Sequence, residues 1–153
     1  MAASEAVLQT FRHLWKMTTS GRNYDRVLKS VNIVSVSPNR GSSRCELTVE
    51  EEHSNGQRTL HGGYMTMMVD TLTLATLAMQ VGRIGVSAQL NMSFFRSADI
   101  GEKVSIDVDV IKAGKSTAFT QAHILNASGE ILAWGTHIIS LTKTRGLESL
   151  SQV

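Results

Sequence analysis

The 153-residue sequence has one cysteine, one proline and almost no net charge. A single cysteine cannot close an intramolecular disulfide, and no group of Cys and His residues has the spacing of a zinc site. This favours a reducing compartment and a protein without a metal, and nothing implies a dissociable cofactor. The formal net charge of +2 predicts no global attraction to nucleic acid or to an anionic membrane, although it leaves room for a local basic site.

Long apolar segments are also absent. No apolar run reaches the roughly 18 residues of a membrane span, and the N-terminus lacks the continuous apolar core of a secretory signal. We therefore expect an intracellular protein with no membrane span. With 42% hydrophobic residues, a chain of this length can bury one sizeable core, so we expect one domain without repeats or linkers.

The first segment, residues 4–19, has the pattern of an amphipathic helix, with Ser4 as a cap. Its basic residues would also suit a mitochondrial presequence, but Glu5 and Asp25 argue against one, and a docked helix is the favoured interpretation. The compartment therefore stays open between cytoplasm and mitochondrion. The residues at helical spacing are Val7, Leu8, Phe11, Leu14, Trp15 and Thr18.

From Ile33 onward the hydrophobic period changes to two. In "SSRCELTVE", Cys45, Leu47 and Val49 alternate with polar residues after a turn marked by proline and glycine, which predicts a β-hairpin. Four further alternating stretches follow at residues 86–95, 103–112, 116–126 and 130–142. The turns "KAGKS" and "NASG" separate the last three.

Between the hairpin and these stretches lies an apolar run, residues 64–79, that is too long for one strand. Its apolar residues cover most of the circumference of a helix, which predicts a buried helix. The fold class is therefore α+β: an antiparallel sheet wrapped around a long central helix, with an N-terminal amphipathic helix.

This order of elements and its motifs resemble the hotdog-fold acyl-coenzyme A thioesterases. The fold has two strands, a helix and a four-strand meander; "HGG" opens the helix here, and Asp70 follows eight residues after Gly62. The resemblance spans nearly the whole chain, through "RNYDRVL", "EEHSN", "TLHGG", "VD", "GVS", "GEKV", "KAGKSTAFT" and "GTH". It implies an N-terminal helical segment at 1–28, a hotdog thioesterase domain at 29–142 and a C-terminal tail at 143–153.

The resemblance also implies a site, a substrate and an assembly. The substrate is an acyl-coenzyme A, and the assembly is a homodimer or homotetramer, a dimer of dimers whose sites are shared across a two-fold interface. The implied catalytic residues are Asn55, His61, Gly62, Asp70 and Ser87. The implied coenzyme A contacts are Phe94, Lys112, Ala113, Gly114, Lys115, Ser116 and Thr117.

The residue types agree with this chemistry. Backbone N–H groups at a helix N-terminus can stabilise the oxyanion that develops in thioester hydrolysis, and Gly62 and Gly63 let a carbonyl approach them. A tight loop-to-helix turn is the other explanation for these glycines. For His61 a role in fixing the loop is favoured, and Asn55 is the better donor to the carbonyl oxygen.

Asp70 interrupts the apolar helix, and two interpretations of it stay open. It can lie on a solvated stripe with Thr66, Thr73 and Gln80, or act as a base or nucleophile, because a carboxylate shielded from water becomes a better proton acceptor. Eight residues at about 1.5 Å each separate it from the helix start by roughly 12 Å. Two antiparallel helices at a two-fold axis would bring both groups to one carbonyl.

The remaining candidates have weaker signals. Ser87 lies on the polar face of its strand, where it can orient water beside Asp70; it lacks a nucleophile-elbow pattern. Lys112 and Lys115 bracket a turn that can face coenzyme A phosphates, although turn lysines are usually only solvated. Three other histidines are expected to be structural or exposed, and Cys45 is expected to be an ordinary core residue. Those histidines are His53, His123 and His137.

We therefore expect a thioesterase favouring medium to long acyl chains, with methionines lining an apolar channel between the central helices. Arg58 beside the site, Gln89 where the family has an acid, and the segment after His137 depart from the family pattern. A hotdog enoyl-thioester hydratase is an alternative, but its usual Asp and His loop pattern is missing. A non-catalytic acyl-coenzyme A or lipid carrier, or a partner-binding module for a lipid-transfer protein, is the other alternative; Asp70 argues against an inert carrier.

Overall fold

The computed structural model describes the backbone of residues 2–146 and the side chains of residues 5–142. It has two α-helices, α1 (Ala2–Thr19) and α2 (Gly62–Val81), and three short 3-10 helices, η1 (Tyr24–Leu28), η2 (Pro38–Arg40) and η3 (Glu51–His53). The strands are β1 (Asn32–Ser37), β2 (Ser42–Thr48), β3 (Arg83–Phe94), β4 (Lys103–Ala113), β5 (Thr117–Leu125) and β6 (Ile131–Gly146). The predicted tail from residue 143 overlaps the end of β6, and its remainder lies outside the described residues.

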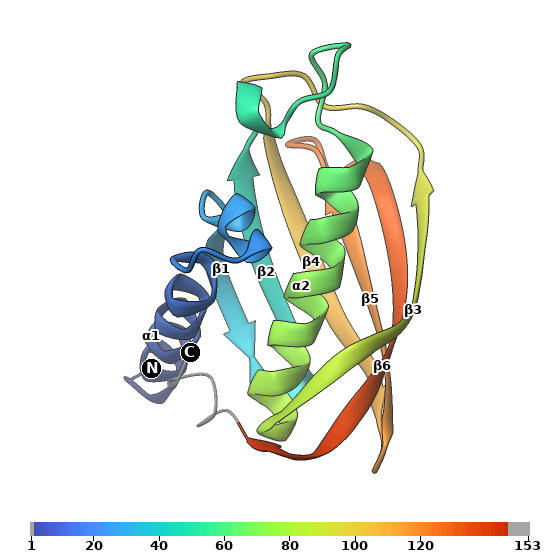
Figure 1. The fold of residues 1–153 in the computed structure, drawn as a ribbon. Helices are drawn as coiled ribbons and strands as arrows, with labels where there is room; N and C mark the ends of the chain where they lie inside the picture. The colour runs from blue at the N-terminus through green and yellow to red at the C-terminus, as the bar shows by residue number, and fades with distance from the viewer. Residues whose placement is uncertain (1, 147–153) are drawn as a thin grey trace.

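The strands form one antiparallel sheet with the order β1-β2-β4-β5-β6-β3, and this sheet curves around α2 (Figure 1). The predicted α+β fold is thus confirmed, including the hairpin, the central helix and the N-terminal helix. The predicted four-strand meander is wrong in one respect, because β3 pairs with β6 and not with β4. The chain leaves α2 at Gly82 and runs back along one side of the helix, and residues 95–102 then carry it across to β4, which pairs with β2.

Local chemistry defines both ends of α2. At its start, the imidazole Nδ1 of His61 accepts a hydrogen bond of 2.8 Å from the N–H of Gly63, which caps the helix. At its end, Gly82 adopts a φ of +67° and donates its N–H to the carbonyl of Ala78, a left-handed cap that glycine adopts without steric cost.

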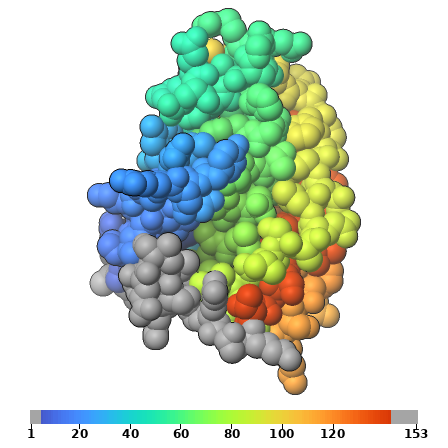
Figure 2. All heavy atoms as spheres, in the orientation of Figure 1, coloured from blue at the N-terminus to red at the C-terminus, as the bar shows by residue number. Residues whose placement is uncertain are grey.

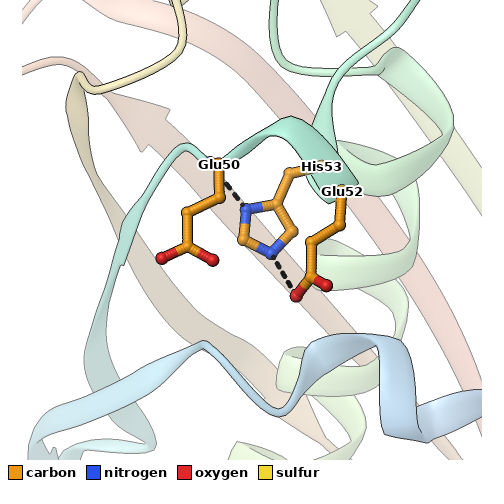
Figure 3. Close-up of side chains that lie close together, drawn as sticks. All are labelled: Glu50, Glu52 and His53. Atoms are coloured by element: carbon orange, nitrogen blue, oxygen red, sulfur yellow. Dashed lines mark hydrogen bonds and ion pairs between the residues drawn. The ribbon is translucent and has the colours of Figure 1, made fainter.

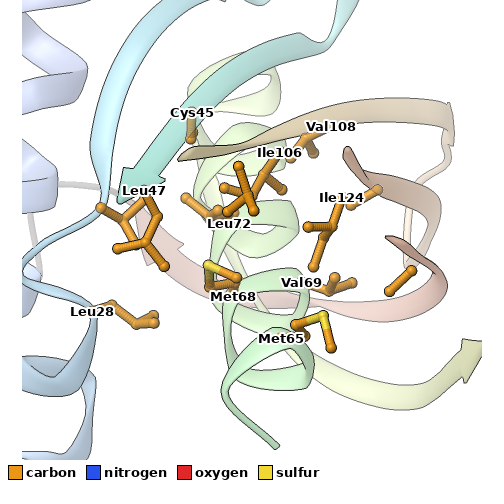
Figure 4. Packing of buried hydrophobic residues seen from close by; sticks show 14 of the residues in the cluster. Leu28, Cys45, Leu47, Met65, Met68, Val69, Leu72, Ile106, Val108 and Ile124 are labelled. Atoms are coloured by element: carbon orange, nitrogen blue, oxygen red, sulfur yellow. The ribbon is translucent and has the colours of Figure 1, made fainter. Parts of the chain in front are cut away.

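The core lies between α2 and the concave face of the sheet (Figure 4). Met68, Val69 and Leu72 of α2 are fully buried against apolar side chains of β2, β4 and β5. α1 packs beside this core through Phe11 and Trp15, and the indole N–H of Trp15 donates to the carbonyl of Val31 at 3.0 Å. The N-terminal helix is therefore docked on the domain, as its spacing predicts. Within residues 2–146, no helix is long and apolar enough to cross a membrane.

Candidate active site

The first half of the candidate site is the turn that opens α2. The N–H of Gly62 makes no hydrogen bond with any described residue, so it points out of the helix end as a free donor. A Cβ added to Gly62 would lie 3.5 Å from the ring of Phe94, so this aromatic side chain, half-exposed at the end of β3, lies against the turn. Because Nδ1 of His61 accepts the Gly63 N–H, the neutral ring carries its proton on Nε2, a second free donor.

Asn55 holds the loop before this turn. Its Oδ1 accepts the backbone N–H groups of Gln57 at 2.9 Å and Thr59 at 3.2 Å, and its Nδ2 donates to the Thr59 hydroxyl at 3.0 Å. The second proton of the amide remains available. The side chain therefore stabilises the loop and still has one donor for a ligand. In the same loop Arg58 adopts a φ of +63°, a conformation that costs energy for a residue with a Cβ.

The second half of the site is Asp70, halfway along α2. The hydroxyl of Ser87 on β3 donates to its Oδ1 at 2.6 Å, so the structure brings together the two residues predicted to activate water. Its Oδ2 makes no hydrogen bond or ion pair within the described residues. The predicted solvated stripe does not exist as such, because Thr73, one turn further on, is completely buried.

A buried histidine completes this half. His137 on β6 lies with its Nε2 3.4 Å from Oδ1 of Asp70 and its Nδ1 2.7 Å from the hydroxyl oxygen of Thr73. That hydroxyl has one proton, and the carbonyl of Val69 is 2.7 Å away as an acceptor. We therefore assign the proton of His137 to Nδ1, which leaves the lone pair of Nε2 facing the carboxylate.

The lone pair of His137 Nε2 and Oδ1 of Asp70 are both hydrogen-bond acceptors, 3.4 Å apart, so a proton between them would stabilise the contact. Burial lowers the pKa of His137, and the negative charge of Asp70 partly opposes this shift. Burial therefore favours the neutral imidazole, whose Nε2 lone pair faces Oδ1 of Asp70. Sequence reasoning missed His137 as a site residue. Its signal was its inward position in the alternation of β6, between the buried Gly135 and Ile139.

A pocket of about 270 Å³ opens beside Asp70, between α1 and α2. Figure 2 shows the blue atoms of η1 next to the green atoms of α2 on this face. The lining is mostly apolar, with Phe11, Leu14 and Trp15 from α1 facing Leu74 and Met79 of α2. Such a pocket, with few polar groups, suits an extended aliphatic or aromatic group. The sequence predicts an apolar channel between two central helices, whereas this pocket lies between α1 and α2 of one chain.

The predicted coenzyme A contacts do not lie together in one chain. Phe94 is at the end of β3 beside Gly62, whereas the "KAGKS" turn is at the other end, where Arg83 donates to the carbonyl of Lys115 at 2.9 Å. Eleven strand residues at about 3.3 Å each separate these ends by roughly 36 Å. Lys112 and Lys115 are both exposed. The two halves of this predicted site thus lie at opposite ends of β3 in one chain.

Another group of titratable residues, Glu50, Glu52 and His53, has ligand atoms within 4.8 Å of one another (Figure 3). Nδ1 of His53 already accepts the N–H of Glu50 at 3.0 Å, so Nε2 carries the proton and points to Glu52 Oε1 at 3.5 Å. A metal would need that nitrogen deprotonated. The contacts instead form a capping box for η3, which gives His53 a structural role.

The other candidates match their predicted roles. Cys45 is fully buried, and burial raises its pKa to about 12, with a smaller contribution from Asp107 and an opposing one from a hydrogen bond with Ser43. Its thiol therefore stays protonated and unreactive. His123 stacks on Trp134 with ring centroids 6.1 Å apart, a structural contact on the outer face of the sheet.

Comparison with known proteins gives concordant matches. The family model of the Thioesterase superfamily matches residues 57–133. The chain is 40% identical to acyl-coenzyme A thioesterase 13 of Homo sapiens over 134 residues, which cover 86% of this chain and 94% of that protein. Among solved structures, zebrafish thioesterase superfamily member 2 matches with a TM-score of 0.85 and 33% identity over 88% of this chain and 98% of that chain. The Mus musculus thioesterase superfamily member 2 matches with a TM-score of 0.82 and 34% identity over 88% and 97%.

Proposed function

Because the chain belongs to the thioesterase superfamily and is an acyl-coenzyme A thioesterase, we propose that it hydrolyses medium- to long-chain acyl-coenzyme A esters to a free fatty acid and coenzyme A. Asp70 activates the water, Ser87 orients it, and the Gly62 amide and Asn55 polarise the thioester carbonyl. The observation that carries this assignment of roles is the hydrogen bond of 2.6 Å between Ser87 and Asp70 at the side of an apolar pocket.

In the proposed reaction, water attacks the carbonyl carbon while Oδ2 of Asp70 takes one of its protons. Oδ1 is already held by Ser87 and faces His137, which orients the carboxylate and leaves Oδ2 as the free acceptor. The tetrahedral oxyanion accepts hydrogen bonds from the Gly62 N–H and the Asn55 amide. When the C–S bond breaks, the proton held by Asp70, or shared with His137, goes to the coenzyme A thiolate.

We further propose that each site is shared between two protomers of a homodimer, or of a homotetramer built from two dimers. Asp70 and Gly62 are roughly 12 Å apart along one helix, so one chain cannot offer both to one carbonyl. β3 supports the pairing, because it is the last strand of the sheet, its outer edge has no partner within residues 2–146, and Val86 and Phe94 on it are exposed. An antiparallel partner would also bring the "KAGKS" turn toward Phe94 of the other chain.

The chain-length preference rests on the pocket beside Asp70. Its volume of about 270 Å³ and its mostly apolar lining suit an aliphatic chain. Each methylene buried there contributes about 0.8 kcal/mol to binding. This supports medium to long chains over short ones, because a longer chain buries more methylene groups. An intracellular location, in the cytoplasm, the mitochondrion or both, is part of the proposal.

The contact between Asp70 and His137 supports a second candidate function, the hydration of enoyl thioesters. Hotdog hydratases pair an Asp with a His, and the fold supplies such a pair although the loop pattern is different. Adding water to an enoyl thioester would leave coenzyme A attached, whereas hydrolysis releases a free thiol. A carrier, or a module that binds a lipid-transfer protein, would do neither.

The test is thiol release from a panel of saturated acyl-coenzyme A esters of graded length, with loss of enoyl absorbance from an unsaturated ester followed in parallel. We expect thiol release that is greatest for medium to long chains and that falls on the order of 100-fold in Asp70→Asn. Asp109→Asn, an exposed carboxylate on β4 away from the pocket, is the matched control and should keep full activity. Hydration without thiol release would favour the hydratase, and binding without either reaction would favour the carrier.

A further inference from the structure

The pocket beside Asp70 contains a second carboxylate. Asp25, in η1, lines the same pocket, and these two aspartates are the charged residues of the lining, which includes no lysine, arginine or histidine. The rest of the lining is apolar apart from two threonines and a glycine. The pocket that the acyl chain would occupy is therefore apolar in shape but negative in charge.

The charge of Asp25 is not neutralised nearby. Among the residues that the structure describes, none gives its carboxylate a hydrogen bond or an ion pair. The adjacent Arg26 directs its guanidinium to the carbonyl of Arg22 at 2.8 Å, and Lys29 lies 3.9 Å from Glu52. Burial raises the pKa of Asp25, and the charge of Asp70 raises it further, which places the two carboxylates within electrostatic reach of each other.

We propose that Asp25 is a specificity-determining residue that admits uncharged acyl chains and excludes chains ending in a carboxylate. This inference rests on the proposed function, and it names the class of acyl group that the site takes. An ω-carboxylate entering the pocket would lose its water and meet two like charges in surroundings of low polarity, where like-charge repulsion is several times stronger than in water. A methyl-terminated chain of the same length has neither this cost of dehydration nor the charge repulsion.

Asp70 alone would repel such a chain to some extent, so the role of Asp25 must be separated from it. Replacing Asp25 by asparagine removes one charge and keeps the size of the side chain. Asp25 precedes Leu28, the buried residue of η1, and makes no described side-chain contact that asparagine would break, so the fold should be retained. Asp25→Lys reverses the charge and gives the pocket a cation that would attract a carboxylate.

The experiment measures kcat/KM for paired substrates of equal length, hexanoyl-coenzyme A against adipoyl-coenzyme A and decanoyl-coenzyme A against sebacoyl-coenzyme A. In the wild-type protein, the uncharged member of at least one pair should be preferred by about tenfold or more. Asp25→Asn should reduce that preference several-fold, mainly by raising kcat/KM for the dicarboxylic ester, with the remainder due to Asp70, and Asp25→Lys should reduce it further. Asp109→Asn should leave the preference unchanged, and Asp25→Ser is the second neutral variant should the asparagine protein fold poorly.

Each outcome decides something different. Equal use of both members of each pair by the wild-type protein would overturn the proposal, and so would an unchanged preference in Asp25→Asn and Asp25→Ser. In both cases hydrolysis of decanoyl-coenzyme A would leave the proposed function standing. Failure of the wild-type protein to release thiol from any of the four esters would overturn the proposed function, and the inference with it.

Discussion

Complementation between two inactive variants tests whether the active site is shared between chains. Asp70→Asn keeps an oxygen that can accept from Ser87 and removes the base, so kcat should fall on the order of 100-fold. Asn55→Asp keeps the oxygen that accepts the N–H groups of Gln57 and Thr59, so the loop should hold, and removes the amide donor. Loss of one oxyanion donor costs on the order of 100-fold or more.

The expected recovery follows from the geometry. Gly62 and Asp70 are separated by roughly 12 Å on one helix, so the proposed shared site combines Asp70 of one chain with the Gly62 turn and Asn55 of another. A mixed dimer of the two variants then has one site with both defects and one site with none. Random pairing makes about half of the dimers mixed, so co-refolded variants should recover roughly a quarter of wild-type activity.

A second mixture provides the control. When a chain with both substitutions is co-refolded with the wild-type chain, every mixed dimer has two defective shared sites, and only wild-type dimers work, again about a quarter of full activity. Sites built within one chain would give almost no activity in the first mixture and about half in the second. Those two values, with mixed dimers verified by mass spectrometry, would refute the shared site and leave the thioesterase assignment intact.

Three further predictions concern stability and substrate binding. Because the pKa of His137 is lowered in the folded protein, the unfolded chain binds a proton at this residue more readily, so the free energy of unfolding should fall as pH drops below the ordinary histidine value of 6.5. The fall should be smaller in His137→Gln. Urea titrations at several pH values measure both, and the same pH dependence in the two proteins would contradict the prediction. Gly135→Ala would place a methyl group 2.6 Å from the sulfur of Met92, so the free energy of unfolding should fall by about 1–3 kcal/mol in denaturant titrations, and an unchanged midpoint would contradict the packing. Lys112→Ala with Lys115→Ala should raise KM for acyl-coenzyme A more than it lowers kcat, less so at high salt; an equal effect on a short thioester without the nucleotide would show that these lysines do not contact coenzyme A.

The elements of the fold could be predicted because their signals are local. Alternation of apolar residues in 103–112 and 116–126 predicts strands, and the apolar circumference of 64–79 predicts a buried helix, since each pattern follows from the geometry of its own element. Pairing of these elements is not local. The residues of β3 do not indicate that it pairs with β6 instead of β4. That pairing depends on where α2 ends and on β4 already lying between β2 and β5 in the sheet.

The candidate site divides in the same way. Asp70 in an apolar helix, the glycines of the "HGG" turn and Ser87 on a polar strand face are conspicuous in the sequence, because each is an exception to the pattern around it. His137 and Asp25 are not exceptions of that kind, and their importance comes from what packs against them. His137 is 67 positions after Asp70 in the sequence, and Asp25 is 45 positions before it. They come close to Asp70 only because β6 and η1 pack beside α2, so tertiary packing alone decided which groups surround that carboxylate.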